Sequence, residues 1–102
     1  MKDYSVIDLL ENYRINQSKL KLIGYKGKAN KELNDLKEKY EKLTFCVNCL
    51  PEEDKQLLTQ IYFDGISIRN ISKMGIMSRS SVVRRRDKAI KLLENLVKTL
   101  EN

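Results

Sequence analysis

Apolar residues recur at alternating steps of four and three along residues 29–50, and no other feature constrains the fold of this chain as strongly. Such spacing returns a side chain to the same side of an α-helix at every turn. Between these positions, the interval 31–42 holds four lysines and four acidic residues, a balance typical of a solvated helix face. The pattern therefore predicts a long amphipathic helix. Its apolar stripe consists of Ala29, Leu33, Leu36, Tyr40, Leu43, Val47 and Leu50.

A second apolar stripe lies in the preceding segment, from about Tyr4 to Ile23, and predicts another amphipathic helix. Gly24 and Gly27 follow within the short segment 24–28 and mark a break between the two helices. A link this short favours an antiparallel hairpin with the two stripes face to face. A coiled-coil dimer through residues 29–50, or a dimer of two hairpins, is the alternative. The stripe of the first helix is formed by Val6, Leu10, Tyr13, Gln17 and Leu20.

A third helix is expected to begin after Leu50. Pro51 suits the first helical position, where its missing N–H is not needed, and the acidic residues 52–54 suit the positive end of the helix dipole. Gly65 would end this helix in a left-handed conformation. The apolar face of the helix would comprise Leu57, Leu58, Ile61 and Tyr62.

Serine residues mark the starts of the last two helices. Ser67 is a suitable N-cap for a short helix that runs to about Met74, and residues 75–77 form a tight turn. Ser78 is a suitable N-cap for the last helix, which runs to about Leu100. A short helix, a tight turn and a longer basic helix make a helix-turn-helix. The predicted fold is therefore all-α, with an N-terminal helical hairpin in residues 1–49 followed by a three-helix helix-turn-helix domain in residues 50–102.

The last helix carries most of the surplus charge of the protein. Residues 78–91 hold six basic residues and one acidic residue, a net charge of +5, whereas the whole chain has a net charge of +6. A basic stripe of this kind is the electrostatic signature of a protein that binds a polyanion. At 100° per residue, apolar and polar residues of this helix separate onto opposite sides. The predicted core face comprises Val82, Ala89, Leu93, Leu96 and Leu100; Ser80, Ser81, Arg84, Asp87, Lys88 and Lys91 face outward, Arg85 and Arg86 flank the core face, and Val83 and Ile90 lie beside it.

Length and composition limit the classes of protein that fit. A chain of 102 residues makes one small domain, or a small domain with an appendage, and a spacious enzyme cleft is not expected. One proline and four glycines are too few for a many-stranded β fold. No apolar run approaches the ~20 residues needed to span a bilayer, and the first residues lack the apolar segment of a secretory signal. We therefore expect a soluble cytoplasmic protein with no membrane partner.

Cys46 and Cys49 are the two cysteines of the chain, which contains no histidine. Zinc usually takes four cysteine or histidine ligands, and the surrounding sequence lacks the βαβ setting of a thioredoxin-like motif. Structural thiols are the favoured interpretation, with a metal site shared in a dimer or a redox switch as the alternatives. The sequence shows neither a nucleophile with a suitable base nor a glycine-rich phosphate loop. We therefore expect no catalytic residues, no cofactor and no metal.

Five short segments of the second half follow one another in the order found in a known family. They are Leu-Pro-Glu-Glu at 50–53, Ile-Tyr-Phe-Asp-Gly-Ile-Ser-Ile at 61–68, Ile-Ser at 71–72, Ser-Arg-Ser-Ser-Val at 78–82 and Ala-Ile at 89–90. From Leu50 to about Leu96 the chain resembles region four of bacterial sigma factors. The segment Arg-Arg-Asp-Lys-Ala at 85–89, with the helical N-terminal extension, is closer still to small phage transcriptional activators of the RinA and ArpU type. The family usually has alanine in place of Ser72, leucine in place of Gly75 and an apolar residue in place of Arg86. No segment resembles the sigma region that melts the −10 element, so a complete sigma factor is not expected.

The resemblance implies a sequence-specific DNA-binding transcriptional regulator of phage or prophage origin, with its last helix in the major groove. The N-terminal half of such a helix touches base edges, and the planar guanidinium of Arg84 matches the O6 and N7 atoms of guanine. The other cations of this helix suit phosphates, and Arg69 and Lys73 of the preceding helix suit the DNA backbone. The candidate DNA-contacting residues are Arg69, Lys73, Ser78, Arg79, Ser80, Ser81, Arg84, Arg85, Lys88 and Lys91.

Two other functions remain open. The protein could dock on RNA polymerase, as sigma region four does, with little DNA affinity of its own. It could also be a DNA-packaging recognition subunit of a phage, a class that joins a helix-turn-helix to an oligomerising helical region. The expected partners are therefore double-stranded DNA, RNA polymerase as an alternative, and a second copy of the chain through the N-terminal helices.

Overall fold

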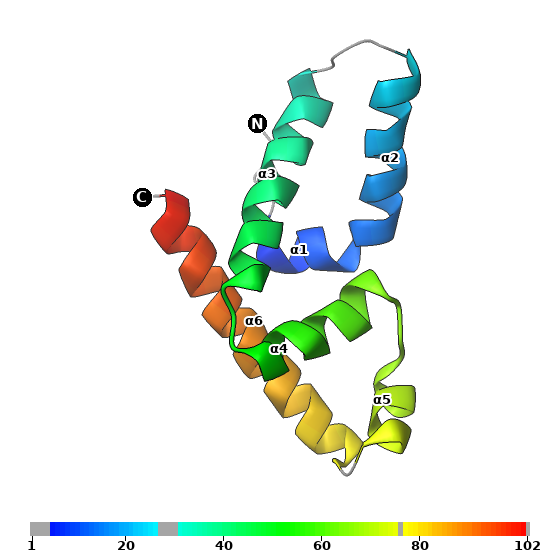
Figure 1. The fold of residues 1–102 in the computed structure, drawn as a ribbon, viewed down its shortest axis with the longest axis vertical. Helices are drawn as coiled ribbons and strands as arrows, with labels where there is room; N and C mark the ends of the chain where they lie inside the picture. The colour runs from blue at the N-terminus through cyan, green and yellow to red at the C-terminus, as the bar shows by residue number, and fades with distance from the viewer. Residues whose placement is uncertain (1–4, 27–30, 76, 102) are drawn as a thin grey trace.

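The protein folds into packed α-helices, which confirms the all-α prediction. The computed structural model describes residues 5–26, 31–75 and 77–101, and every regular element within these ranges is helical. The described residues fill a volume of 47 × 31 × 21 Å (Figure 1). The elements are α1 (Val6–Glu11), α2 (Tyr13–Lys26), α3 (Lys31–Asn48), α4 (Glu52–Leu58), the π-helical segment η1 (Thr59–Phe63), α5 (Ile68–Met74) and α6 (Arg79–Glu101).

Helix α3 follows the apolar stripe from which it was predicted. Four residues of the stripe within this helix are buried, whereas the charged residues between them are exposed or half-buried. Leu33 is half-buried, and Leu50, just beyond the helix, is buried. Ala29 lies outside the described residues. The buried stripe residues of α3 are Leu36, Tyr40, Leu43 and Val47.

The prediction of one continuous helix from Tyr4 to Ile23 was wrong, because the helix is interrupted at Asn12. The backbone of Asn12 adopts φ −103° and ψ 17°, and its side-chain amide donates to the carbonyl of Asp8 over 2.9 Å. The interruption turns α1 across the lower ends of α2 and α3 (Figure 1), where both Leu9 and Leu10 are buried. The spacing of the stripe could not reveal this turn, because tertiary burial of α1 decides it.

The first three residues of the predicted break at residues 24–28 are helical. Helix α2 continues through Lys26, so Gly24 lies within the helix rather than between two helices. Residues 27–30 lie outside the described part of the chain. Glycine lowers helix stability by only ~1 kcal/mol, a cost that the rest of a helix readily offsets.

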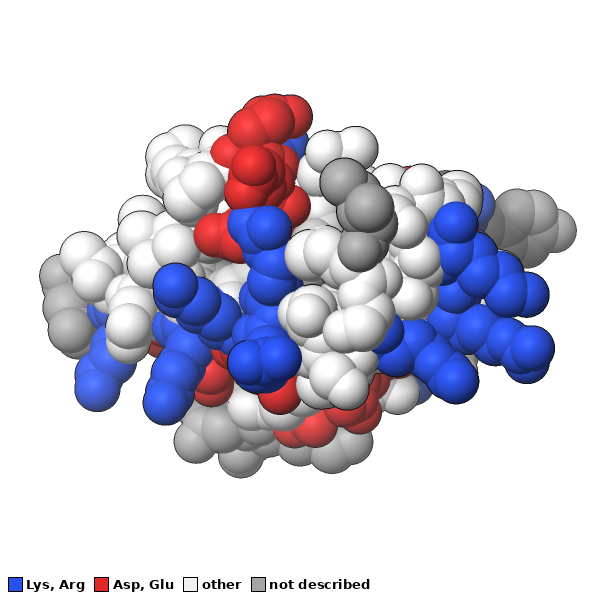
Figure 2. Space-filling model, turned by 90° about the horizontal axis from the view of Figure 1, so that it is seen from below, with Lys and Arg blue, Asp and Glu red and all other residues white. Residues whose placement is uncertain are grey.

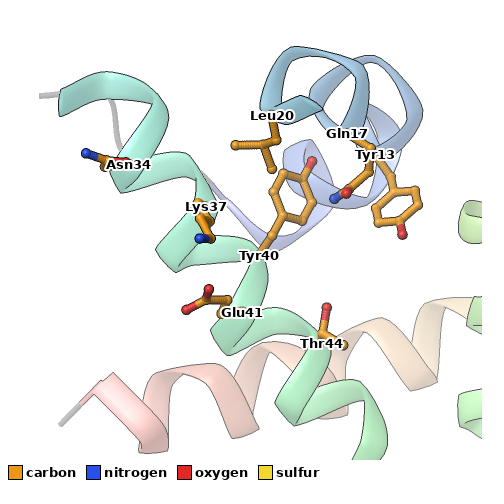
Figure 3. Close-up of a pocket in the computed structure, with 8 residues that line it drawn as sticks. All are labelled: Tyr13, Gln17, Leu20, Asn34, Lys37, Tyr40, Glu41 and Thr44. Carbon is orange, nitrogen blue, oxygen red and sulfur yellow. The ribbon is translucent and has the colours of Figure 1, made fainter. Parts of the chain in front are cut away.

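Helices α2 and α3 run in opposite directions and are in contact, with α1 across their lower ends (Figure 1). The buried Tyr40 hydroxyl accepts a hydrogen bond from the Asn16 side chain over 2.8 Å and donates to the carbonyl of Leu9 over 2.6 Å. Tyr40 therefore connects α1, α2 and α3 at one point. A groove of about 660 Å³, of which Tyr40 is part of the wall, opens between α2 and α3 (Figure 3). Its lining residues are Tyr13, Gln17, Leu20, Asn34, Lys37, Tyr40, Glu41 and Thr44.

A single hydrophobic cluster joins the two halves of the chain across the predicted boundary at residues 49–50. Leu10 and Leu43 from the first half pack in it with Leu58 and Leu93 from the second half, and none of the four is more than 1% exposed. A smaller cluster of Leu57, Ile71 and Val82 holds α4, α5 and the start of α6 together. Residues of the second half therefore belong to both clusters, and the adjacent residues Leu57 and Leu58 pack in different ones.

The segment from α4 to Gly65 is fastened to the start of α2. The ring centroids of Tyr13 and Phe63 lie 4.4 Å apart, and the guanidinium of Arg14 donates to the Asp64 carbonyl over 2.7 Å. Gly65 has φ +71°, which confirms the predicted left-handed conformation, and an added Cβ there would lie 2.6 Å from the Arg14 guanidinium.

Helix α4 begins at Glu52, so Pro51 immediately precedes its first residue rather than occupying it. Leu57 and Leu58 are buried as predicted, whereas Ile61 and Tyr62 are half-buried. The π-helical turn of η1, in which the Asp64 amide donates to the Thr59 carbonyl over 2.9 Å, changes the direction of the apolar face after Leu58.

Candidate nucleic-acid interface

Helix α5 is a short helix with the predicted serine cap. The Ser67 hydroxyl accepts from the Asn70 amide over 3.2 Å, and Ile71 is buried in the smaller cluster. The Ser72 hydroxyl donates to the Met77 carbonyl over 2.9 Å and so ties α5 to the residues that lead into α6. No role for Ser72 was predicted from the sequence, although a hydroxyl at a position usually held by alanine was the available signal. Ile76 of the predicted turn lies outside the described residues.

Helix α6 also begins at its predicted cap. The Ser78 hydroxyl accepts from the Ser81 amide over 3.2 Å, and the two serine hydroxyls are 3.1 Å apart. Val82, one turn into the helix, is fully buried against α4 and α5. The start of α6 is thus held in place by a cap and by a hydrophobic contact. It lies at the end of the molecule opposite the last turn of α2 and the first turn of α3 (Figure 1).

The buried side of α6 differs from the predicted core face at three residues, because Ile90 is buried, Leu96 is only half-buried and Leu100 is exposed. Val82, Ala89 and Leu93 are fully buried as predicted, but Ile90 is buried as well, because α6 packs against helices on two sides. Leu100 is 45% exposed, so its assignment to the core face was wrong. Helix α6 lies at an angle to α3 (Figure 1), and Glu101 in its last turn pairs with Lys39 of α3 over 3.1 Å.

Four residues on the opposite side of α6 form an outward arc: Ser80, Arg84, Lys88 and Lys91. All four are exposed, and at 100° per residue they fall within about 80° of one another. Within the described part of the chain, the three cations of this arc have no ion-pair partner. Arg79, at the first position of the helix, is exposed and likewise has none there. We name these five residues the outward surface.

Asp87 also lies on the outward side, but its charge is compensated by its neighbour. Arg86 donates from Nε and Nη2 to one carboxylate oxygen of Asp87, over 3.1 and 2.9 Å. Arg86 is half-buried, as expected for an arginine whose stem packs near the core while its head reaches a carboxylate. The single acidic residue of the basic segment therefore subtracts little from the positive field of the outward surface.

Arg85 does not belong to the outward surface, although it was a candidate DNA-contacting residue. Its guanidinium forms an ion pair with the carboxylate of Glu53 on α4. The two side chains are 44% and 78% exposed, and a pair this exposed contributes only ~0–1 kcal/mol to stability. Sequence reasoning missed Glu53, because no periodicity relates two residues on different helices.

Two further cations lie on α5. Arg69 and Lys73 are both exposed, and neither has an ion-pair partner among the described residues. Ser81 is half-buried, with its hydroxyl at hydrogen-bonding distance from that of Ser78, so it is less accessible than Ser80. The remaining candidate residues are all exposed, and they are Ser78, Arg79, Ser80, Arg84, Lys88 and Lys91.

Figure 2 views the molecule from below relative to Figure 1. Lysine and arginine side chains gather in two groups on this face, with uncharged surface between them, and acidic side chains appear both at its upper edge and along its lower part. The first turn of α4 contributes the acidic residues Glu52, Glu53 and Asp54. The face is therefore basic but bordered by negative charge.

The cysteines lie away from this face, at the end of α3. Cys46 is buried and Cys49 is exposed. Burial raises the pKa of the Cys46 thiol, and the nearby Cys49 and Glu101 raise it further. Cys46 is thus the neutral, packed thiol expected of a structural cysteine. No group of three or more cysteine, aspartate or glutamate side chains in the described ranges is arranged to hold a metal ion.

Comparison of the chain with protein-family models, curated proteins and solved structures gives no match. In addition, none of the described helices is long and apolar enough to cross a membrane. The geometry and charge of the outward surface are therefore the basis for a functional proposal.

Proposed function

We propose that the protein is a sequence-specific DNA-binding transcriptional regulator that places the first half of α6 in the major groove. The observation that carries this proposal is the outward surface, whose unpaired cations lie along one side of a helix with its other side buried. The major groove is ~12 Å wide and admits one α-helix. The proposal agrees with the resemblance of residues 50–96 to sigma region four and to phage activators.

The outward surface favours a division of roles between its cations. Arg84 lies one turn beyond Ser80 in the first half of α6, the part of a recognition helix that contacts base edges. Its guanidinium can donate two parallel hydrogen bonds to the O6 and N7 atoms of guanine. Lys88 and Lys91 lie further along the helix, where a groove-bound helix passes the phosphates. Arg69 and Lys73 of α5 would contact the backbone on the other side of the turn.

Docking on an acidic protein surface, such as one of RNA polymerase, is the competing function for the same cations. A protein partner would be recognised through matching charges and apolar contacts, and Met74 of α5 is 66% exposed beside Lys73. The two functions differ in whether binding depends on DNA sequence. Selection of bound duplexes from a random pool distinguishes them, because only the DNA-binding function yields a consensus.

Arg84→Ala and Lys91→Ala should weaken DNA binding in different ways. Loss of the Arg84 base contact should cost ~1–3 kcal/mol with the selected duplex and relax the preference at one base pair. Loss of Lys91 should weaken binding to all sequences alike, because a phosphate contact carries no sequence information. Fluorescence anisotropy titrations with the selected duplex, and with duplexes changed at each base pair, measure both effects.

Lys21→Ala is the matched control for these substitutions. Lys21 is exposed on α2, which begins beside the main cluster and extends away from the basic face. Its removal should leave affinity and preference unchanged. If Arg84→Ala and Lys91→Ala change sequence preference equally, the assigned roles are wrong, and if no duplex is enriched, sequence-specific DNA binding is wrong.

A further inference from the structure

The side chain of Arg85 is directed to an acidic residue rather than to the outward surface. Arg85 lies about 100° around α6 from Arg84, on the side that faces α4. Its Nη2 atom pairs with the Glu53 carboxylate, and its Nη1 atom lies 4.0 Å from the sulfur of Met77. One guanidinium is therefore held between the first turn of α4 and the residues that lead into α6.

Glu53 occupies an unusual position for a carboxylate on a basic face. It is 78% exposed and lies in the first turn of α4, next to the acidic residues Glu52 and Asp54. A carboxylate there has two effects on an approaching polyanion. It repels phosphates directly, and it occupies a guanidinium that would otherwise be free to bind one.

The consequence for DNA binding follows from the role of phosphate contacts. Each phosphate that a cation neutralises strengthens binding to every sequence, because counterions are released wherever the protein lies on the duplex. Specificity is the ratio between affinity for the target and affinity for the large excess of other sites. When a cation is kept away from the phosphates, the affinity for non-target sites is lower because one phosphate contact is missing. The base contact of Arg84 with the target is retained.

We propose that Glu53 is a specificity-determining residue, which acts by holding Arg85 away from the DNA phosphates and so limits sequence-independent affinity. This inference rests on the proposed DNA-binding function and adds a residue that the sequence did not indicate. Glu53 is a positioning residue in this scheme, since it acts through Arg85 and touches no base. Arg85, in turn, contributes no phosphate contact in the wild-type protein.

The test is the salt dependence of binding to a mixed-sequence duplex, measured by anisotropy between 50 and 200 mM NaCl. Glu53→Ala should tighten binding by about twofold to fivefold at 100 mM salt, within the ~0–1 kcal/mol of the exposed pair that it breaks, and should make the log–log slope steeper by about 0.9, the increment for one added phosphate. Arg85→Ala should leave the wild-type slope unchanged. Circular dichroism of each variant verifies the fold.

Glu52→Ala is the matched control. It removes the same charge from the same turn of α4, but Glu52 makes no ion pair with Arg85. The double variant Glu53→Ala/Arg85→Ala should behave like Glu52→Ala, because the freed guanidinium is gone. If Glu53→Ala has the slope of Glu52→Ala while the wild type binds duplex, the inference is overturned and the proposed function stands. If the wild type binds no duplex at 50 mM salt, both are overturned.

Discussion

Leu93→Ala should lower the free energy of unfolding by about 2–5 kcal/mol. Leu93 is completely buried in the main cluster, where it packs with residues from α1 and α3 as well as from its own half of the chain. Truncation to alanine removes the apolar contacts of one methine and two methyl groups and leaves a cavity that close-packed neighbours fill only in part. Small proteins are stable by only ~5–15 kcal/mol, so this loss is a large fraction of the total.

Urea denaturation followed by circular dichroism measures this effect, and Leu92→Ala is the matched control. Leu92 is the preceding residue of the same helix and is 37% exposed, so the same truncation there should cost about 1 kcal/mol or less. Both variants should unfold in one transition, since the cluster joins the two halves of the chain. Equal losses for the two variants would contradict the described packing of α6.

Affinity for duplex DNA should fall by about three orders of magnitude between 50 and 200 mM NaCl. Six exposed cations without ion-pair partners in the described residues lie on α5 and the first half of α6. Arg84 is assigned to a base, so if each of the other five neutralises about one phosphate, the log–log slope is about −4.5, and a fourfold rise in salt gives a loss of roughly 500-fold, close to three orders of magnitude. The six cations are Arg69, Lys73, Arg79, Arg84, Lys88 and Lys91.

Anisotropy titrations at several salt concentrations give the slope directly. Lys91→Ala should reduce its magnitude by about 0.9, because one phosphate contact is lost, whereas Lys21→Ala should leave it unchanged. A slope near zero for the wild type would mean that the binding surface is not the basic face. A slope that Lys21→Ala reduces as much as Lys91→Ala would place the contact surface on the N-terminal helices instead.

Local signals in the sequence were sufficient for most helix boundaries in the second half. Ser67 and Ser78 are caps whose hydroxyls bond to amides three residues later, and Gly65 is required by a positive φ. Each of these helix ends depends on residues that are close together in the chain, so a short stretch of sequence is enough to predict it. The apolar stripe of α3 was predictable for the same reason, since helical periodicity alone defines it.

Long-range contacts determined the features that the sequence did not predict. The interruption at Asn12 follows from the burial of α1 against the rest of the molecule, and a regular stripe does not show it. The pairing of Arg85 with Glu53 joins residues 32 positions apart, as the contact of Arg14 with the Asp64 carbonyl joins residues 50 apart. Periodicity assigned Arg85 to a side of the helix correctly, but it could not show which helix lies there.

Mapping of amide chemical shifts tests most directly whether α6 faces the duplex. A chain of 102 residues is well suited to nitrogen-15 spectra, recorded with and without the selected duplex at 50 mM NaCl. The largest shifts should fall between Ser67 and Lys91, in α5, the turn and the first half of α6, with α2 and the first turns of α3 unchanged. Largest shifts in α2 and α3, or none anywhere at saturating duplex, would contradict DNA binding through this helix.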